Sequence, residues 1–431
     1  MGDEERQVLI NETKTFSRSK SNAGDELHSF RTCLRWMCVD QSNPWRASLS
    51  WSLFFILAIL VPILSHFGLA CAECDANLHR PYDAVLQLSL TIIATVSFLS
   101  LSKFVEKYGL RRFLNLDKLC HESEKVRQGY TAELNRSLKL LALFVLPCFC
   151  AEGAYKIWWY SSGASQIPFL GNVYVSDAIA CMLELCSWLY RTSIFFLVCI
   201  LFRLICYLQI LRLQDFAKVF QEESDVESVL KEHLRIRRHL RITSHRYRAF
   251  ILSCLIIITA SQLASLLNTT KPFADVSIYR TGELALCSMT LMAGLFILLR
   301  SATRITHKAQ SVTCLAAKWH ICATLDSFDA TDRETPTAQI ASCGRLFQND
   351  ESEEEDAGDE EDDIDTTKIV IPAFAHSISF QKRQALVTYF ENNRAGITVF
   401  GFMLDRTSLH TIFMIELSLV LWLLGKTVGI S

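Results

Sequence analysis

The residues of this sequence most suited to chemistry are charged side chains inside long apolar stretches. Glu152 and Lys156 lie one helical turn apart in one stretch, and Glu184 and Arg191 lie seven residues apart in the next. A charge at the centre of a lipid bilayer costs at least about 2.5 kcal/mol on insertion scales, so it normally faces a partner or a water-filled cavity. Charges of both signs on neighbouring helices therefore predict one shared polar site.

Two interpretations of this site stay open at the level of sequence. The charges form either an internal salt-bridge network that holds the helices together or a polar cavity that binds a ligand. The ligand-pocket candidates under the second interpretation are Glu152, Tyr155, Lys156, Glu184, Trp188 and Arg191.

The last apolar stretch carries a carboxylate of its own. Glu416 stands near its middle, and His410 lies nearer its start. A lone carboxylate in a membrane helix either faces water or is protonated in a packed interface. Under the first alternative the helix lines a pore, and the pore-lining candidates are His410, Thr411, Glu416 and Ser418.

Motifs of soluble enzymes are missing from the sequence. It contains no GxxxxGK[ST] phosphate loop, no HExxH zinc motif and no GxSxG nucleophile elbow. His233, His239 and His245 are six residues apart, so on one helix they lie on different faces and do not form a metal site. We therefore expect neither an enzyme nor a bound metal or cofactor, and the net charge of −2 gives no indication of a nucleic-acid partner.

Seven apolar stretches are long enough to position these groups in a membrane. A helix rises 1.5 Å per residue, so about 20 residues span a hydrocarbon core about 30 Å thick. The predicted transmembrane helices cover residues 47–70, 84–102, 138–160, 178–205, 249–267, 282–299 and 408–424. The predicted fold class is an all-α integral membrane protein.

The distribution of Lys and Arg predicts the orientation of these helices. Seven basic residues precede the first helix, one lies in the next loop, eight lie in 103–136, and none lies in 161–177. Rich and poor segments go on alternating along the chain. The N-terminus is therefore predicted in the cytoplasm and the C-terminus outside, the reverse of G-protein-coupled receptors.

The segments outside the membrane differ in character. Residues 1–46 form a polar N-terminal segment, and the loops 103–136 and 207–247, within the block 47–306, carry apolar residues at helical spacing. Residues 307–375 form a linker, in which 350–365 hold twelve acidic residues of sixteen and predict disorder. The final segment, 376–431, begins with another predicted helix.

Two positions are candidates for modification. Ser352 lies within the acidic run and could carry a regulatory phosphate, although a plain solvated linker is the simpler interpretation. Asn268, in an Asn-Thr-Thr sequon, is the only one of three sequons that the predicted orientation places outside.

Three passages carry a resemblance to known proteins. They are WWYSSGASQIPF near the end of the third helix, LRIRRHLRITSHRYRAFILS leading into the fifth, and AGITVFGFMLDRTSLHTIFMIELSLVLWLLGKT at the seventh. The sequence resembles a plant family of gustatory-receptor-like membrane proteins along essentially its whole length. It is more distantly similar to insect gustatory and odorant receptors, which share the predicted inverted seven-helix topology.

The insect resemblance implies a homotetrameric cation channel whose last helices line a central pore, with a ligand pocket among the outer ends of the early helices. Plasma membrane is the localisation that it implies. The insect signature of the last helix has Thr-Tyr followed by Gln-Phe. Here Thr411 fits, but Ile412 replaces the Tyr, and Ser418 and Leu419 replace the Gln-Phe pair.

Three functions follow as hypotheses. The first is a ligand-gated or regulated ion channel with a lipid bilayer, a permeant cation, a small-molecule ligand and three further copies of itself as partners. The alternative is a membrane scaffold that recruits cytoplasmic partners through the acidic segment. A secondary transporter is the third, although seven helices do not divide into two equal repeats.

Overall fold

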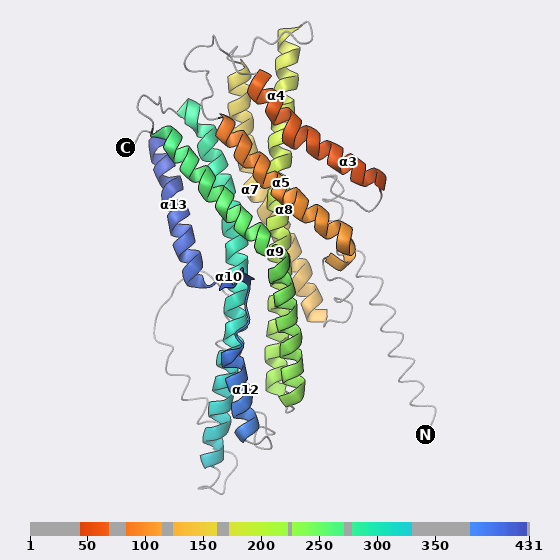
Figure 1. Ribbon diagram of the computed structural model, residues 1–431, viewed down its shortest axis with the longest axis vertical. Helices are drawn as coiled ribbons and strands as arrows, with labels where there is room; N and C mark the ends of the chain where they lie inside the picture. The colour runs from red at the N-terminus through yellow and green to blue at the C-terminus, as the bar shows by residue number, and fades with distance from the viewer. Residues whose placement is uncertain are drawn as a thin grey trace. The chain divides into compact units, whose positions relative to one another are not determined.

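The computed structural model describes residues 44–68, 83–113, 124–161, 172–222, 226–270, 278–329 and 380–428 (Figure 1). Within these residues the chain is helical except for one short hairpin and its connections. The helices are α3 (Pro44–Phe54), η1 (Phe55–Leu60), α4 (Val61–Gly68), α5 (Asp83–Phe113), α7 (Glu124–Ser161), α8 (Val173–Glu222), α9 (Val226–Thr269), α10 (Ile278–Asp329), α12 (Phe380–Asn392) and α13 (Arg406–Val428).

Seven helical segments in the described part of the chain are long and apolar enough to cross a membrane, which confirms the predicted number. They are Trp45–Phe67, Asp83–Lys103, Ala132–Ser161, Tyr174–Gln214, Val229–Thr269, Gly282–Lys318 and Arg406–Gly425. The first consists of α3, η1 and α4 together. The fourth, fifth and sixth are far longer than a bilayer requires, because α8, α9 and α10 continue as helices into amphipathic sequence.

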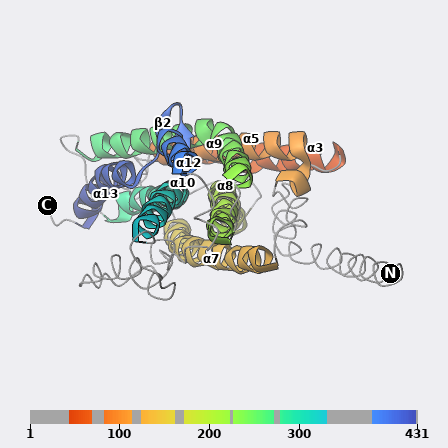
Figure 2. The same ribbon diagram turned by 90° about the horizontal axis from the view of Figure 1, so that it is seen from below.

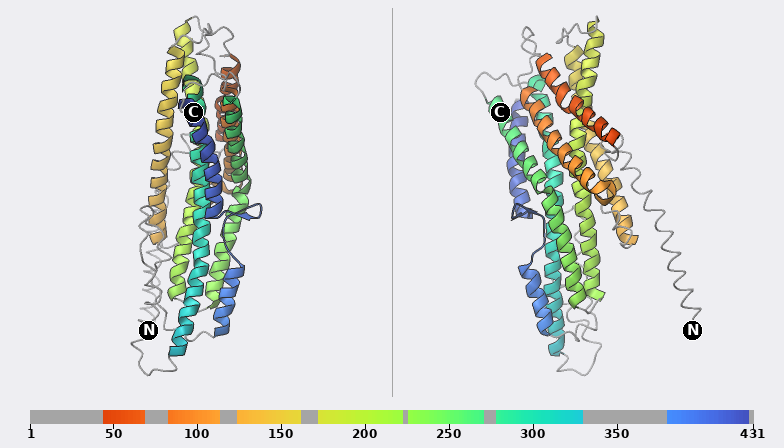
Figure 3. Two further views of the ribbon diagram at one scale, coloured as in Figure 1. Left: turned by 90° about the vertical axis from the view of Figure 1, so that its left-hand side faces the viewer. Right: turned by 45° about the vertical axis from the view of Figure 1, so that its right-hand side comes forward.

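By its contacts the chain divides into two units. Unit 1 consists of Met1–Leu204, Phe250–Leu298 and His410–Ser431, and unit 2 of Ile205–Ala249 and Leu299–Leu409. Figure 2 and Figure 3 show the long helices from further directions. Each unit is described by itself below.

The most buried helix of unit 1 is the first part of α8. From Ile194 to Phe202 nearly every side chain has lost its contact with solvent. A helix that is apolar on all sides is typically buried in the interior of a bundle, and this part of α8 is apolar on all sides. Gly294 of α10 lets the ring of Phe195 approach closely, because a Cβ atom at this glycine would lie 2.2 Å from Phe195 Cε1.

The first transmembrane segment contains a π-helical stretch, Phe55–Leu60. A π-helix alters the regular pattern of backbone hydrogen bonds, and other groups often take part where it does. Thr91 Oγ1 of α5 donates to the Ala58 carbonyl at 3.1 Å, and Ser187 Oγ of α8 donates to the Leu57 carbonyl at 2.6 Å. Hydroxyls of two neighbouring helices therefore support this stretch.

Within the described residues, unit 2 contains the one feature that departs from an all-α fold. Strands β1 (Thr398–Val399) and β2 (Phe402–Met403) pair antiparallel in the link between α12 and α13, drawn in blue in Figure 3. Phe400 and Gly401 form the turn with φ of 49° and 95°. Two positive φ angles are what a two-residue hairpin turn requires, and glycine meets that requirement without strain.

Helices α9 and α10 anchor the link and α12 within unit 2. The backbone N–H of Ile397 donates to Thr306 Oγ1 at 3.1 Å, and that of Thr398 donates to Ser244 Oγ at 3.2 Å. The His233 ring of α9 packs edge-on against Phe390 of α12, with ring centroids 4.5 Å apart.

Candidate functional site

A buried ammonium group joins three helices of unit 1. Lys156 Nζ of α7 lies 2.7 Å from Glu283 Oε1 of α10 and 2.9 Å from Glu184 Oε2 of α8. Glu152, one turn before Lys156 on α7, is farther from it, with 3.8 Å between Oε1 and Nζ. The side chains of these four residues are at most 7% exposed, so three carboxylates share one ammonium away from solvent.

Arg191 brings a second positive charge into the same part of unit 1. Its guanidinium donates from Nη1 to the Gln87 carbonyl at 3.4 Å and to Thr91 Oγ1 at 3.3 Å. Because Thr91 in turn donates to Ala58, a chain of hydrogen bonds runs from the guanidinium of α8 to the π-helical stretch. Arg191 therefore ties α8 to α5 and, through Thr91, to the first segment.

A fourth acid lies at the start of α5. Asp83 is buried, and its Oδ1 accepts a hydrogen bond from Gln87 Nε2 at 3.1 Å. Its Oδ2 lies 3.2 Å from Nδ1 of His66 on α4, a ring that is partly exposed. One residue earlier on α4, the Ser65 hydroxyl donates to Glu184 Oε1. Helices α4, α5, α7, α8 and α10 thus all contribute polar groups. We call this set of side chains the ionic cluster; it consists of Ser65, His66, Asp83, Gln87, Glu152, Lys156, Glu184, Arg191 and Glu283.

The ionic cluster is almost filled by its own side chains. The cavity among them offers about 10 Å³ to the centre of a water molecule, which is room for about one water. Its lining is Val61, Pro62, Ser65, Gln87, Glu152, Lys156, Glu184, Ser187, Trp188 and Arg191. In this arrangement the cavity has room for a molecule of the size of water, and a larger ligand could bind only if the helices moved.

Five of the six predicted pocket residues line this cavity. Tyr155, the sixth, is half-buried and stacks near Trp158, with ring centroids 6.1 Å apart. Sequence reasoning missed Glu283 and Asp83. Each is an acid near the beginning of an apolar helix, where an acid is common and therefore gives little signal.

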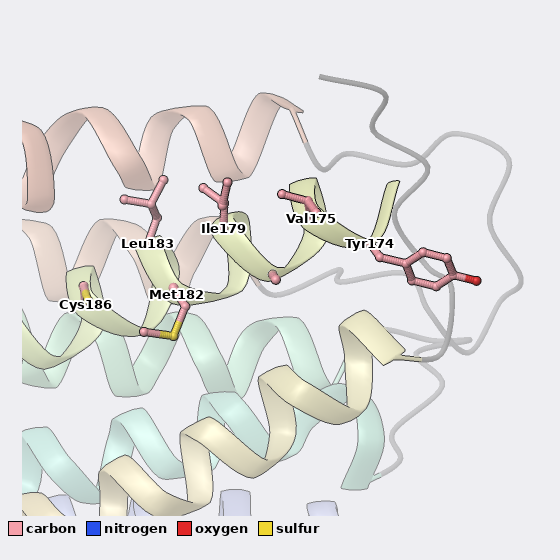
Figure 4. Close-up of a pocket in the computed structure, with 7 residues that line it drawn as sticks. Tyr174, Val175, Ile179, Met182, Leu183 and Cys186 are labelled. Carbon is pink, nitrogen blue, oxygen red and sulfur yellow. The ribbon is translucent and has the colours of Figure 1, made fainter. Parts of the chain in front are cut away.

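A larger hollow lies on the surface of α8. It measures about 490 Å³ and is lined by Tyr174, Val175, Ala178, Ile179, Met182, Leu183 and Cys186. Figure 4 shows the labelled side chains projecting from this single helix, with Tyr174 pointing away from the others. An open apolar hollow on one helix suits lipid chains or a neighbouring helix, whereas a polar ligand finds no hydrogen-bonding groups among its aliphatic side chains.

The last helix has two different faces. Glu416 is buried, and its carboxylate accepts a hydrogen bond from the hydroxyl of Thr259 on α9. Thr411 and Ser418 lie on the exposed side, together with Met414 and Ile415. His410, the first residue of α13 that belongs to unit 1, is also exposed. The four pore-lining candidates therefore do not share one face, because the acid points toward α9.

The structure describes one of the two candidates for modification. Asn268 is half-buried in the last turn of α9, where Thr269 Oγ1 donates to the Ser265 carbonyl at 2.9 Å. Ser352 and the acidic run 350–365 lie outside the described residues.

The sequence matches a known protein family over most of its length. Residues 25–415 match the family described as "Protein of unknown function (DUF3537)". The chain belongs to the DUF3537 family. A comparison with curated proteins gave no match. The resemblance to plant gustatory-receptor-like proteins stays a prediction.

The fold of this DUF3537 protein is also found in a solved structure, that of the insect olfactory receptor OR5 from Machilis hrabei. The two chains superpose with a TM-score of 0.53 over 93% of this chain and 99% of the receptor, at 14% sequence identity. At that identity the likeness establishes a shared fold. The predicted distant relationship to insect receptors is thereby supported at the level of the fold.

Proposed function

We propose that this DUF3537 protein is a regulated ion channel of the receptor type, with a cation-conducting pore between four copies of the chain. The observation that carries the proposal is the insect olfactory receptor fold, which extends over 93% of the sequence. The predicted inverted seven-helix topology supports it independently of that superposition, whereas the last helix keeps only Thr411 of the insect signature.

The proposed orientation rests on the basic residues. Lys and Arg are abundant before the first helix and in 103–136, and they are scarce in 71–83 and 161–177. Loops that stay in the cytoplasm are typically rich in Lys and Arg, whereas loops on the other side of the membrane are poor in them. The N-terminus of the proposed channel is therefore cytoplasmic and its C-terminus lies on the opposite side of the membrane. The plasma membrane is the location that the resemblance to insect receptors implies.

The exposed face of α13 is the part of the chain that we assign to the pore. Thr411 and Ser418 are seven residues apart, so they lie on one side of the helix, and both carry a hydroxyl that can face an ion's hydration shell. In the proposed tetramer Glu416 stands behind this face. Its carboxylate then affects permeation through the electric field rather than by touching ions.

The ionic cluster is the proposed regulatory site. It joins α5, α7, α8 and α10 through buried charges and α4 through the Ser65 hydroxyl, so a change in its charge or contents alters the packing of all five helices. A small-molecule ligand that reaches this place has to displace side chains, which would couple ligand binding to a movement of the helices.

Cysteine substitution tests the pore assignment in protein reconstituted into planar bilayers. Currents through Thr411→Cys and Ser418→Cys should be blocked by a charged thiol reagent, whereas Val420→Cys, at a buried position of the same helix, should be unaffected. The wild type, with its sixteen native cysteines, supplies the baseline. Conducting variants that the reagent leaves untouched would remove this face from the pore, and a correctly assembled protein that passes no current would exclude a channel.

A further inference from the structure

Helix α9 carries a basic face within unit 2. Arg235, Arg238, Arg241 and His245 are exposed, and Arg248 is half-buried. Their spacing of three or four residues places all five on one side of the helix. Clusters of Lys and Arg beside the cytoplasmic end of a transmembrane helix attract the headgroups of anionic lipids. We call these five side chains the basic face of α9.

The basic face ends where the predicted membrane-spanning part of α9 begins. That part starts at Ala249, directly after Arg248. Farther along the helix the exposed side chains include the aliphatic Ile256 and Leu263. Arg241 lies about 12 Å before Ala249 along the helix axis, a distance that a long side chain can largely bridge. Arg241 and Arg248 are therefore within reach of the headgroups of the leaflet on that side.

The hairpin of β1 and β2 presents two phenylalanines beside this boundary. Phe402 is 80% exposed and Phe400 is 54% exposed. The guanidinium carbon of Arg248 lies 5.0 Å from the centroid of the Phe400 ring, and the Thr398 N–H donates to Ser244 Oγ of α9 at 3.2 Å. Exposed aromatic rings next to basic side chains are typical of segments that lie in the interface of a membrane.

The turn of this hairpin holds Phe400 in an unfavourable conformation. Its φ of 49° lies in the left-handed region, which residues with bulky side chains rarely adopt. Asn or Gly is the usual residue at this position of a two-residue turn. Strained backbone positions recur at functional sites. Strain and exposure at the same residue therefore indicate that the apolar tip of the hairpin has a partner.

We propose that the basic face of α9 and the tip of the hairpin together bind an anionic lipid of the cytoplasmic leaflet. Phe400 and Phe402 enter the boundary between headgroups and acyl chains, while Arg241 and Arg248 bind the phosphate of the headgroup. A guanidinium has five N–H donors, so Arg248 can bind phosphate while it keeps its contact with His245 at 3.2 Å. The site needs only the membrane, so it does not depend on ion conduction.

Native mass spectrometry tests the headgroup contacts on the full chain in mixed micelles. The wild type should retain phosphatidylserine in preference to phosphatidylcholine. Arg241→Gln and Arg248→Gln should each lower the apparent affinity for phosphatidylserine about fivefold, the contribution of one basic residue near an anionic surface. Arg235→Gln is the matched control and should bind like the wild type. Arg235 is exposed on the same helix but lies about 20 Å before Arg248 and contacts Glu232.

Hydrogen exchange in lipid nanodiscs tests the hairpin. Replacing part of the phosphatidylcholine by phosphatidylserine should slow the exchange of the backbone amides of residues 400–403 in the wild type. Phe402→Ser should abolish this slowing. Leu234→Ser is the matched control and should keep it, because Leu234 is also exposed, at 48%, but lies one residue before Arg235. Melting temperatures equal to the wild type in pure phosphatidylcholine verify that the variants are folded.

The outcomes separate the possible partners of this surface. Equal retention of the two lipids by the wild type, or full retention of phosphatidylserine by both arginine variants, overturns the proposal. A preference for phosphatidylserine that arises only after deletion of residues 350–365 would assign the basic face to the acidic segment of the chain itself. A smaller assembly mass of the Phe402→Ser protein would assign the hairpin to a contact between copies.

Discussion

The hydroxyl of Thr259 on α9 donates a hydrogen bond to the carboxylate of Glu416 in the middle of the last helix. This contact turns the only acid of α13 away from the face that carries Thr411 and Ser418. It also gives a buried carboxylate one hydrogen-bond donor in an environment without bulk water. The pair therefore determines which face of the last helix is exposed, and it attaches that helix to α9.

Thr259→Val should loosen this attachment. The substitution keeps the shape of the side chain but leaves a buried carboxylate oxygen without its donor, which costs on the order of 1–3 kcal/mol. We expect a lower melting temperature of the purified protein. Thr290→Val is the control, because among the described residues the hydroxyl of Thr290 donates to the Leu286 carbonyl of its own helix and to no other helix. Equal melting temperatures for the two variants would contradict the importance of the Thr259–Glu416 contact.

Gly294→Ala should destabilise unit 1 by overpacking. The added methyl group would lie 2.2 Å from Phe195 Cε1 and 2.5 Å from its Cζ, and relieving such a clash typically costs about 1–3 kcal/mol. At Gly153 the nearest atom to an added methyl is 4.0 Å away, so Gly153→Ala is the matched control. Replacing Phe195 by Leu in the Gly294→Ala protein should recover part of the loss. No recovery would place the cause elsewhere.

Lys156→Met should be among the most damaging single substitutions in the chain. It removes the ammonium that three buried carboxylates share, and breaking a buried charge pair costs about 3–5 kcal/mol. Size-exclusion profiles after heating measure the effect. Lys139→Met, at an exposed position of the same helix, should behave like the wild type. A stable Lys156→Met protein would show that the carboxylates are neutralised without the lysine.

His320 in unit 2 predicts a pH dependence of the folding stability. Burial and the nearby charge of Arg383 lower the pKa of His320 below its ordinary 6.5. Between 6.5 and the lowered pKa the unfolded chain binds the proton and the folded chain does not, so stability falls as the pH falls through this window. His320→Gln should remove this part of the melting-temperature profile, and Arg383→Gln should diminish it. A profile unchanged in both variants would contradict the assignment.

The helices of this fold were predictable because a bilayer imposes a length and a polarity on them. About 20 apolar residues are needed for a crossing, and seven stretches meet that need. Their ends were less predictable, since α8, α9 and α10 continue without interruption into amphipathic sequence. The hairpin at Thr398–Met403 was missed because two residues per strand are too few to show an alternating pattern.

The ionic cluster was predictable in part for a related reason. Lys156, Glu184 and Arg191 stand out because their surroundings are apolar, whereas Glu283 sits near a helix start, where an acid is common. The buried face of α13 could not be predicted, because the helix is apolar on all sides. In the structure the contact of Glu416 with Thr259 and the burial of Val420 and Leu423 identify its inner side.

The number of chains in the assembled protein tests the central claim most directly. The protein should be purified in mild detergent, transferred into lipid nanodiscs and weighed by mass photometry, with empty nanodiscs subtracted. The account predicts four copies of the 49.0 kDa chain, because a central pore needs the last helices of several subunits. A stable monomer that retains its thermal transition would contradict a pore between subunits.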